Sequence, residues 1–187
     1  MNKKELRAQL QDRVAAISSD QKKIKSEAIC TQLMSIASIL NANSIFTYLP
    51  LADEVALLPL ISLWIDESRT VSVPLINWDE KTMQSGLLTS LEANALIEGR
   101  YGMKEPREKH PIPSDSIDVV LVPGLGFDAS GGRLGRGGGF YDKFLANARP
   151  PIVIGICFQE QLIDRVPTES HDQLMCAVVT PTNVLMG

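Results

Sequence analysis

The sequence predicts an α/β protein of three layers, with helices on both faces of a mainly parallel sheet. Short apolar runs typical of buried strands alternate along the chain with segments of helical periodicity. Such alternation favours parallel strands joined by crossover helices. The chain has 187 residues, 44% of them hydrophobic, which is enough for one sizeable core. We therefore expect a single domain over residues 1–187.

Four helices are expected. The first, over residues 3–17, carries apolar side chains at spacings of four, four and three (Leu6, Leu10, Val14 and Ile17). The second is expected over 20–40, after a serine cap and before asparagines 41 and 43. The third is expected over 55–67, where Pro59 fits only near the first turn. The fourth is expected over 140–148.

Strands are expected over 44–49, 70–76, 118–122, 152–158 and 175–180, with a less regular one over 83–89. Ligands of open α/β sheets bind beyond the carboxyl ends of the strands. Three polar positions follow such ends: Glu54, a glycine-rich stretch after residue 122, and Gln159. We expect them to form one site.

The most informative segment is 122–143, VPGLGFDASGGRLGRGGGFYDK. Eight of the chain's 13 glycines lie between Gly124 and Gly139, together with Arg133 and Arg136. Clustered glycines let backbone N–H groups point into one concavity, and the helix N-terminus that follows adds partial positive charge. Arginine adds planar, permanently charged donors. The segment therefore predicts a site for a polyphosphate or another polyanion.

Standard nucleotide motifs do not describe this segment. Gly132 to Gly137 has the glycine spacing of a Walker A loop, but Gly138 stands where the lysine belongs. Gly124 to Ala129 has the form of a dinucleotide fingerprint, yet Ser130-Gly131-Gly132 prevents the helix that must follow at once. No nucleophile elbow is present.

Charge and composition exclude several classes. A net charge of −4 argues against nucleic-acid binding. Three scattered cysteines without a CxxC spacing, in apolar sequence surroundings, indicate neither a disulfide framework nor a thiolate metal site. No signal-like or membrane-length apolar run occurs, so we expect a cytoplasmic protein that does not bind membranes. Seven of the 18 basic residues lie in residues 1–25; they suit a solvated helix face, or Lys3 and Arg7 contact a phosphate.

Several single residues have two interpretations. Asp142, in the first turn of the last helix, is either a carboxylate that interacts with the helix dipole or a ligand of a magnesium ion beside phosphates. Asp172 could reach the same metal. Glu54 suits either a buried edge or a substrate. His171 is expected to have a structural role in a loop, and His110 to have none in the site. Trp64 and Trp78 are expected to pack rather than to bind a ligand.

The segment VPGLGFDASGGRLGRGGGFYDKFL resembles the signature of the 5-formyltetrahydrofolate cyclo-ligase family, also called 5,10-methenyltetrahydrofolate synthetases. The resemblance continues, in the family's order, through KKELR at 3–7, TYLPLADEV at 47–55, GMKEP at 102–106 and VPTESHD at 166–172. It implies a ring closure that depends on ATP and Mg²⁺. Transfer of the γ-phosphoryl group to the formyl oxygen activates it, N10 attacks the same carbon, and phosphate leaves. It also implies a fold similar to those of sugar-phosphate isomerases and CoA-transferases.

Matched by position, the resemblance assigns residues to each ligand. ATP would meet Lys3, Lys4, Arg7 and the loop of Arg133, Leu134, Gly135, Arg136, Gly137, Gly138, Gly139, Phe140 and Tyr141. The folate would meet Leu49, Glu54, Tyr101 and the part of that loop from Arg136 to Phe140. Asp142 and Asp172 would hold magnesium, and Arg136 and Lys3 would act on the reacting groups. Two positions depart from the family: Gly138 stands where some members have lysine, and Phe140 where tyrosine is usual.

The expected partners are small molecules only, namely 5-formyltetrahydrofolate, with one or several glutamates, and ATP; the expected state is a monomer. A competing hypothesis is a non-catalytic domain that binds a sugar phosphate or another effector, as related folds do in regulators. That hypothesis predicts an attached DNA-binding segment, and residues 1–40 contain no clear helix-turn-helix. A further alternative is another ATP-dependent phosphoryl transfer on a pteridine or heterocycle.

Overall fold

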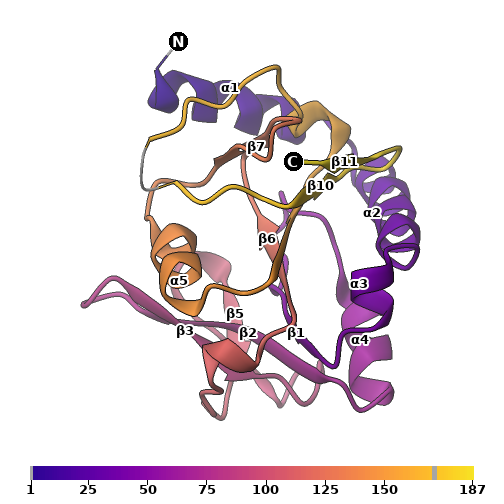
Figure 1. Ribbon diagram of the computed structural model, residues 1–187, viewed down its shortest axis with the longest axis vertical. Helices are drawn as coiled ribbons and strands as arrows, with labels where there is room; N and C mark the ends of the chain where they lie inside the picture. The colour runs from indigo at the N-terminus through magenta and orange to yellow at the C-terminus, as the bar shows by residue number, and fades with distance from the viewer. Residues whose placement is uncertain (1, 170–171) are drawn as a thin grey trace.

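The computed structural model describes residues 2–169 and 172–187 (Figure 1). Its helices are α1 (Lys3–Ala15), α2 (Ser19–Leu33), α3 (Ala37–Leu40), α4 (Leu58–Asp66) and α5 (Phe140–Ala148). Its strands are β1 (Ser44–Phe46), β2 (Thr70–Asn77), β3 (Thr82–Leu87), β4 (Leu96–Glu98), β5 (Lys104–Pro106), β6 (Val119–Pro123), β7 (Gly126–Phe127), β8 (Arg133–Leu134), β9 (Ile152–Ile156), β10 (Ala177–Val179) and β11 (Val184–Met186). Short 3-10 turns span Arg100–Gly102, Ser114–Ser116 and Gln159–Gln161.

Within the described residues, the central sheet has seven strands in the order β11-β10-β9-β6-β1-β2-β3. The pairs from β10 to β2 are parallel, and only the two edge pairs, β2–β3 and β10–β11, are antiparallel. This confirms the predicted α/β class and mainly parallel sheet. The sheet brings the carboxyl ends of β1 and β6 together, since Ile45 pairs with Val119.

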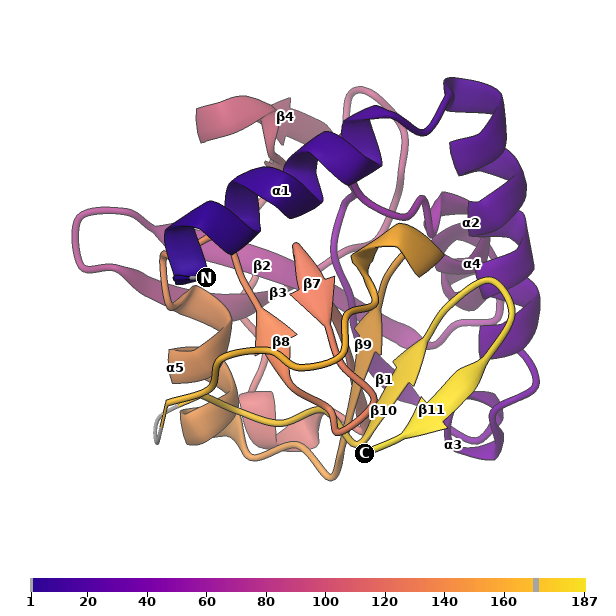
Figure 2. The same cartoon turned by 90° about the horizontal axis from the view of Figure 1, so that it is seen from above.

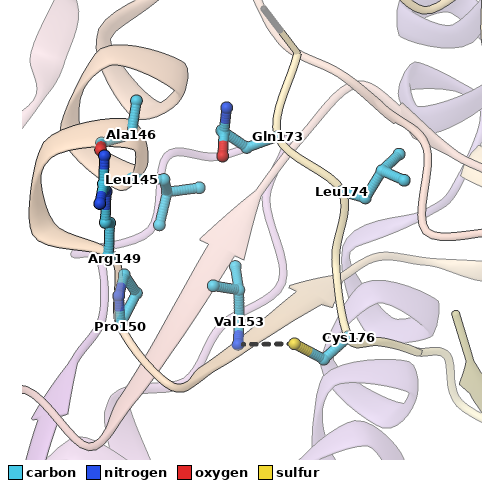
Figure 3. Close-up of a pocket in the computed structure, with 8 residues that line it drawn as sticks. All are labelled: Leu145, Ala146, Arg149, Pro150, Val153, Gln173, Leu174 and Cys176. Atoms are coloured by element: carbon cyan, nitrogen blue, oxygen red, sulfur yellow. Dashed lines mark hydrogen bonds between the residues drawn. The ribbon is translucent and has the colours of Figure 1, made fainter.

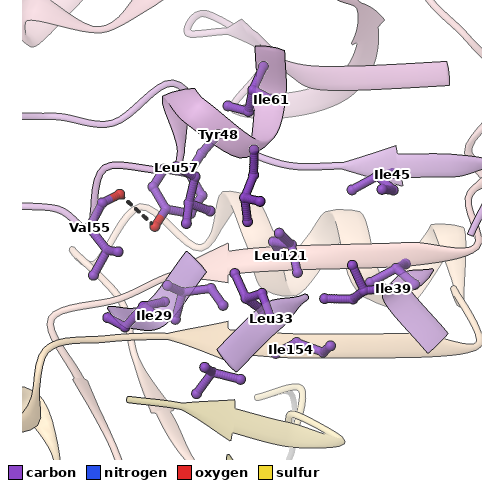
Figure 4. Packing of buried hydrophobic residues seen from close by; sticks show 14 of the residues in the cluster. Ile29, Leu33, Ile39, Ile45, Tyr48, Val55, Leu57, Ile61, Leu121 and Ile154 are labelled. Atoms are coloured by element: carbon purple, nitrogen blue, oxygen red, sulfur yellow. Dashed lines mark hydrogen bonds between the residues drawn. The ribbon is translucent and has the colours of Figure 1, made fainter. Parts of the chain in front are cut away.

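Helices cover both faces of the sheet. On one face, α2, α3 and α4 bury Leu33, Ile39 and Ile61 against the β1, β6 and β9 side chains (Figure 4). On the other face, Phe144 of α5 stacks on Phe46 of β1 with 4.7 Å between ring centroids. Successive side chains of β1 point to opposite faces of the sheet, so this strand contributes to both cores. The result is the expected three-layer arrangement.

Helix α1 lies next to β7 (Figure 2), and Val14 near its end joins the core under α2 and α4. It buries Leu6 and Leu10 in a small separate core with Leu134 and Val166. Gly126 of β7 allows this approach, because a Cβ there would lie 2.6 Å from a methyl group of Leu10. The helix therefore packs directly on the glycine-rich segment.

Some predicted boundaries are wrong. The helix expected over 20–40 ends at Leu33, and α3 follows as a separate turn. The Ser35 hydroxyl donates to the Gln32 carbonyl (2.7 Å), a local bond that competes with continued helix. The helix expected from residue 55 begins at Leu58, with Pro59 in its first turn as predicted. The β4–β5 and β7–β8 ribbons and the edge strand β11 were not predicted. None of the described helices has the length and apolar character needed to span a membrane.

Candidate active site

A cavity of about 980 Å³ opens at the carboxyl ends of β1 and β6. The first turns of α1, the loop after β1, the glycine segment and the start of α5 all contribute side chains to it. Its lining contains the residues that the sequence assigned to the site: Lys3, Arg7, Leu49, Glu54, Tyr101, every residue from Arg133 to Asp142, and Asp172. Lys4 and Gln159 are not in that lining, and the Gln159 side chain accepts a hydrogen bond from Thr182 instead.

A second pocket, of about 460 Å³, lies between α5 and the segment before β10 (Figure 3). Cys176 lies in it, exposed, and its Sγ accepts a hydrogen bond from the Val153 N–H at 3.5 Å. The exposure of Cys176 corrects the expectation that all three cysteines have apolar surroundings. The sequence assigned no site residue to this pocket.

Lys3 is placed by the cap of α1. The Asn2 side chain accepts from the N–H groups of Lys4 and Glu5 at 3.0 and 2.9 Å, and the Glu5 carboxylate accepts from the Asn2 N–H at 3.1 Å. This capping box starts the helix at Lys3, where the helix dipole opposes a cation. Two carboxylates offset this unfavourable interaction of the Lys3 charge with the helix dipole, since Lys3 Nζ lies 2.8 Å from Glu169 and 3.0 Å from Asp172. These bonds, above all that to Glu169, raise the pKa of Lys3.

Arg7, one turn further along α1, holds the glycine segment. Its Nε donates to the Gly135 carbonyl at 2.9 Å. Gly137 lies against the same guanidinium, because a Cβ there would be 3.5 Å from Arg7 Cζ. Gly137 and Gly139 have φ of 101° and 69°, in the left-handed region that glycine adopts without strain. The loop therefore needs glycine at these two positions to fold over α1.

Arg133 is a buried cation in the wall of the cavity, with a relative exposure of 8%. Its guanidinium bonds the Asp142 carboxylate at 2.9 Å and lies 5.4 Å from the centroid of the Tyr141 ring. Burial raises the pKa of Tyr141 well above its ordinary value, so the phenol stays neutral. The start of α5 thus presents a neutral hydroxyl beside a carboxylate that is paired with arginine.

Arg136 bridges two carboxylates on the loop after β1. Its Nη2 lies 2.6 Å from Asp53 and 3.2 Å from Glu54. Glu54 is also held by its own loop, since its Oε2 accepts from the Leu51 N–H at 3.1 Å. Burial raises the pKa of Glu54, against the opposing effects of the Leu51 N–H and Arg136. Glu54 is therefore an acceptor in a largely dry wall.

Three aromatic rings line another part of the cavity. Trp78, at the end of the β2 strand, lies edge-on to Tyr101 and to Phe140, with centroid distances of 5.4 and 5.3 Å. Arg100 lies over the Trp78 ring at 5.7 Å. Tyr101 is 82% exposed and has φ of 61°, a strained conformation for this residue. The Tyr101 ring therefore lines the cavity and remains largely open to solvent.

The two departures from the family pattern are in contact with each other. A Cβ at Gly138 would lie 2.7 Å from the Phe140 ring. Gly138 does not have a positive φ, so its backbone could carry a side chain if the ring moved. A lysine at 138 and this position of the Phe140 ring therefore exclude one another.

The two carboxylates expected to hold a divalent cation, Asp142 and Asp172, both line the cavity, which also contains the carboxylates of Asp53, Glu54, Glu105 and Glu169. Hard Mg²⁺ takes oxygen ligands and commonly uses only one or two carboxylates when phosphate oxygens complete its shell. Among the described residues, no group of three or more His, Cys, Asp or Glu side chains gathers into a metal cage. The donor set therefore fits a metal that arrives with a phosphate ligand.

Other predicted residues lie elsewhere. Trp64, a residue of α4, is fully buried, as expected, and His110 is exposed beside Glu108. His171 lies outside the described residues. Trp78 packs on Tyr101 and Phe140, as expected, and it also lines the cavity. Asp53 and Glu169 were not singled out from the sequence; their position next to predicted site residues was the one available signal.

Comparison with known proteins agrees with this fold and cavity. A profile of the 5-formyltetrahydrofolate cyclo-ligase family matches residues 1–181. The chain is 28% identical to the 5-formyltetrahydrofolate cyclo-ligase of Mus musculus, over 91% of this chain and 89% of that protein. It is 31% identical to the one of Mycolicibacterium smegmatis, over 76% of this chain and 75% of that protein. The solved structure of Aquifex aeolicus 5,10-methenyltetrahydrofolate synthetase superposes with a TM-score of 0.86 and 26% identity, covering 100% of this chain and 93% of that one.

These matches span almost the whole chain, including each segment that lines the cavity. The fold is that of an α/β enzyme, and the family and relatives that match the chain are ligases of folate metabolism. The chain belongs to the 5-formyltetrahydrofolate cyclo-ligase family. This membership sets aside the alternative of a non-catalytic effector-binding domain.

Proposed function

We propose that the protein closes 5-formyltetrahydrofolate to 5,10-methenyltetrahydrofolate in this cavity, with conversion of ATP to ADP and phosphate. The observation that carries the proposal is that residues expected for ATP, for folate and for Mg²⁺ line one cavity. A volume of about 980 Å³ is at the upper end of the range for small-molecule sites, as two ligands require.

The phosphates are expected between α1 and the start of α5. Lys3, Arg7 and Arg133 provide cations there, and the glycine backbone from 135 to 139 provides N–H groups. The N-terminus of α5 begins at Phe140 in the same wall and adds its dipole. These groups replace the charge that a Walker lysine would supply.

An exchange of partners would admit the metal and the nucleotide together. In the protein alone, Lys3 is bonded to Asp172 and Arg133 to Asp142. If the two cations turn to phosphate oxygens, the two carboxylates become ligands for Mg²⁺. The metal would neutralise phosphate charge during transfer. Each ion pair would thus hold in place one cation for a phosphate oxygen and one carboxylate for the metal.

The folate is expected on the opposite side, from Leu49 and Glu54 to the aromatic rings. The Glu54 carboxylate is placed to accept hydrogen bonds from N–H groups of the pterin. Trp78, Tyr101 and Phe140 offer faces and edges to a planar ring. Arg136, bonded to Glu54, is expected where the folate and the nucleotide would meet.

The chemistry needs positioning more than a protein nucleophile. The formyl oxygen attacks the γ-phosphorus of ATP, the bond to the β-phosphate oxygen breaks, and ADP leaves. N10 then attacks the formyl carbon, and the bond from that carbon to the phosphorylated oxygen breaks, so that phosphate leaves with the oxygen and N10 loses its proton. Arg136 and Lys3 would stabilise the negative charge on the transferred group.

Product formation tests this proposal. Purified protein is incubated with 5-formyltetrahydrofolate, ATP and Mg²⁺, and the methenyl chromophore is followed in the near ultraviolet. Matched reactions omit ATP or replace Mg²⁺ with EDTA, and released phosphate is measured in parallel. Equal amounts of methenyl product and phosphate are expected; no product at high enzyme concentration would refute the proposal.

A further inference from the structure

Asp128 is a buried carboxylate that the mechanism above does not use. It lies in the turn between β7 and β8, with a relative exposure of 4%. Its Oδ1 accepts from the N–H groups of Ser130 and Gly132, both at 2.9 Å. Its Oδ2 accepts from the N–H of Val166 at 2.7 Å. One carboxylate is therefore bonded to two segments that are 34 or more residues apart in the sequence.

The two segments lead to opposite walls of the proposed phosphate site. Gly132 immediately precedes Arg133, which bonds Asp142. Val166 leads to the turn in which the Glu169 N–H donates to Asp172 Oδ2 at 2.7 Å and the Asp172 N–H donates to the Glu169 carbonyl at 3.0 Å. Asp128 thus bonds two segments: one leads into Arg133, the partner of Asp142, and the other leads toward Glu169, the partner of Asp172.

The Asp128 carboxylate lies very close to the backbone of the turn between β7 and β8. A Cβ at Gly132 would lie 2.4 Å from Asp128 Oδ2, so the close approach of this carboxylate depends on glycine there. The Asp128 backbone adds two bonds across the same turn, with the Gly132 carbonyl (3.1 Å) and the Gly131 N–H (3.1 Å). Four hydrogen bonds therefore close the turn on the loop side, and the bond to Val166 joins this turn to the segment that leads to Glu169.

We propose that Asp128 is a positioning residue that sets the separation of Asp142 and Asp172 for a metal–nucleotide complex. The inference rests on the proposed function of that pair. Asp128 itself touches neither substrate nor metal. Partners that orient metal ligands commonly affect affinity by about tenfold to a hundredfold when they are removed.

Asp118 supplies a matched control. Its Oδ2 also accepts from two backbone N–H groups, those of Asn43 (2.8 Å) and Ser44 (2.9 Å), but at the amino ends of β1 and β6, away from the cavity. Asp118→Asn should therefore reproduce a general loss of stability without changing the metal site. In Asp128→Asn, the amide oxygen can accept hydrogen bonds from one segment only. The amide NH₂ then faces an N–H donor of the other segment, so that hydrogen bond is lost.

The experiment measures binding of Mn²⁺ in the presence of ATP by electron paramagnetic resonance, together with the melting temperature of each variant. Asp128→Asn should weaken Mn²⁺ binding about tenfold or more, while the affinity for 5-formyltetrahydrofolate alone and the Mn²⁺ affinity of Asp118→Asn stay at wild-type values. Wild-type Mn²⁺ affinity in Asp128→Asn, or an equal loss in Asp118→Asn, would overturn the inference. Should Asp128→Asn not fold, Asp128→Glu takes its place with the same expected loss, and wild-type affinity there overturns it. Absence of Mn²⁺–ATP binding by the wild-type protein would instead remove the proposed function, and the inference with it.

Discussion

Replacing Arg136 by alanine removes the cation that joins the glycine loop to the loop after β1. Its guanidinium is bonded to Asp53 at 2.6 Å and to Glu54 at 3.2 Å. In the proposed complex the same charge faces the group that is transferred from ATP to the folate. The expected consequence is a loss of transition-state stabilisation, with little change in the fold.

The magnitude follows from charge and exposure. Two unit charges about 4 Å apart attract by ~1 kcal/mol in water and by ~4 kcal/mol at an effective dielectric constant of about 20. The Arg136 side chain is 41% exposed, so solvent screening moves the value toward the lower end of that range. A loss of about 1.4 kcal/mol corresponds to a kcat/KM lowered about tenfold.

Steady-state kinetics of methenyl formation measure this loss, at saturating ATP and varied 5-formyltetrahydrofolate. Arg13→Ala is the matched control, because Arg13 is exposed on α1, outside the cavity lining, and its removal changes the net charge equally. Arg136→Lys should recover part of the activity, since it keeps the charge. Wild-type kcat/KM in Arg136→Ala would remove Arg136 from the site and refute the electrostatic argument.

Three further predictions concern other walls of the cavity. Asp142→Asn should move the Mg²⁺ concentration for half-maximal activity about tenfold upward; an unchanged titration would leave Asp142 with only its role at the helix dipole. Trp78→Ala should raise KM for the folate roughly threefold to tenfold, the worth of an aromatic contact, and leave KM for ATP as it is; the reverse pattern would contradict the placement of the folate. Glu54→Gln should weaken folate binding and yet raise the free energy of unfolding at pH 7, because burial raises the pKa of Glu54 and so disfavours its charged form in the folded state. The sign follows from linkage: the native state binds more protons, so wild-type stability falls as pH rises through the window above the ordinary Glu pKa, and the difference from Glu54→Gln should vanish in thermal melts below about pH 4.

Local sequence patterns correctly predicted several elements of the fold. The spacing of Leu6, Leu10 and Val14 predicted α1, and the apolar run into Val122 predicted β6. Pro59 correctly marked the first turn of α4. These elements follow from periodicity and from the missing N–H of proline, which are properties of a few neighbouring residues. The helix predicted over 20–40 was wrong, since α2 ends at Leu33; the bond of the Ser35 hydroxyl to the Gln32 carbonyl is a local alternative to helix that a periodic pattern does not reveal.

The candidate site was predicted as a set of residue types at fixed positions, and the cavity lining contains nearly all of them. The position of Trp78 in the cavity lining was not predicted, because an aromatic residue after a strand looks the same in sequence whether it lies in a core or in a cavity wall. Asp128 had a local signal, since Asp followed by Ser-Gly-Gly favours a turn closed by the carboxylate. The hydrogen bond from the Val166 N–H to Asp128 had no signal in the sequence, because it forms between segments that only folding brings together.

The sequence by itself determined the layered α/β class, and it predicted the glycine segment as an anion site together with the cations, carboxylates and backbone N–H groups around it. Only the tertiary structure decided which charges meet: Lys3 with Asp172, Arg133 with Asp142, and Arg136 with Glu54. Periodicity and motifs depend on neighbours along the chain, whereas the pairing of side chains 9 to 169 residues apart depends on how the parallel sheet brings its carboxyl ends and α1 together.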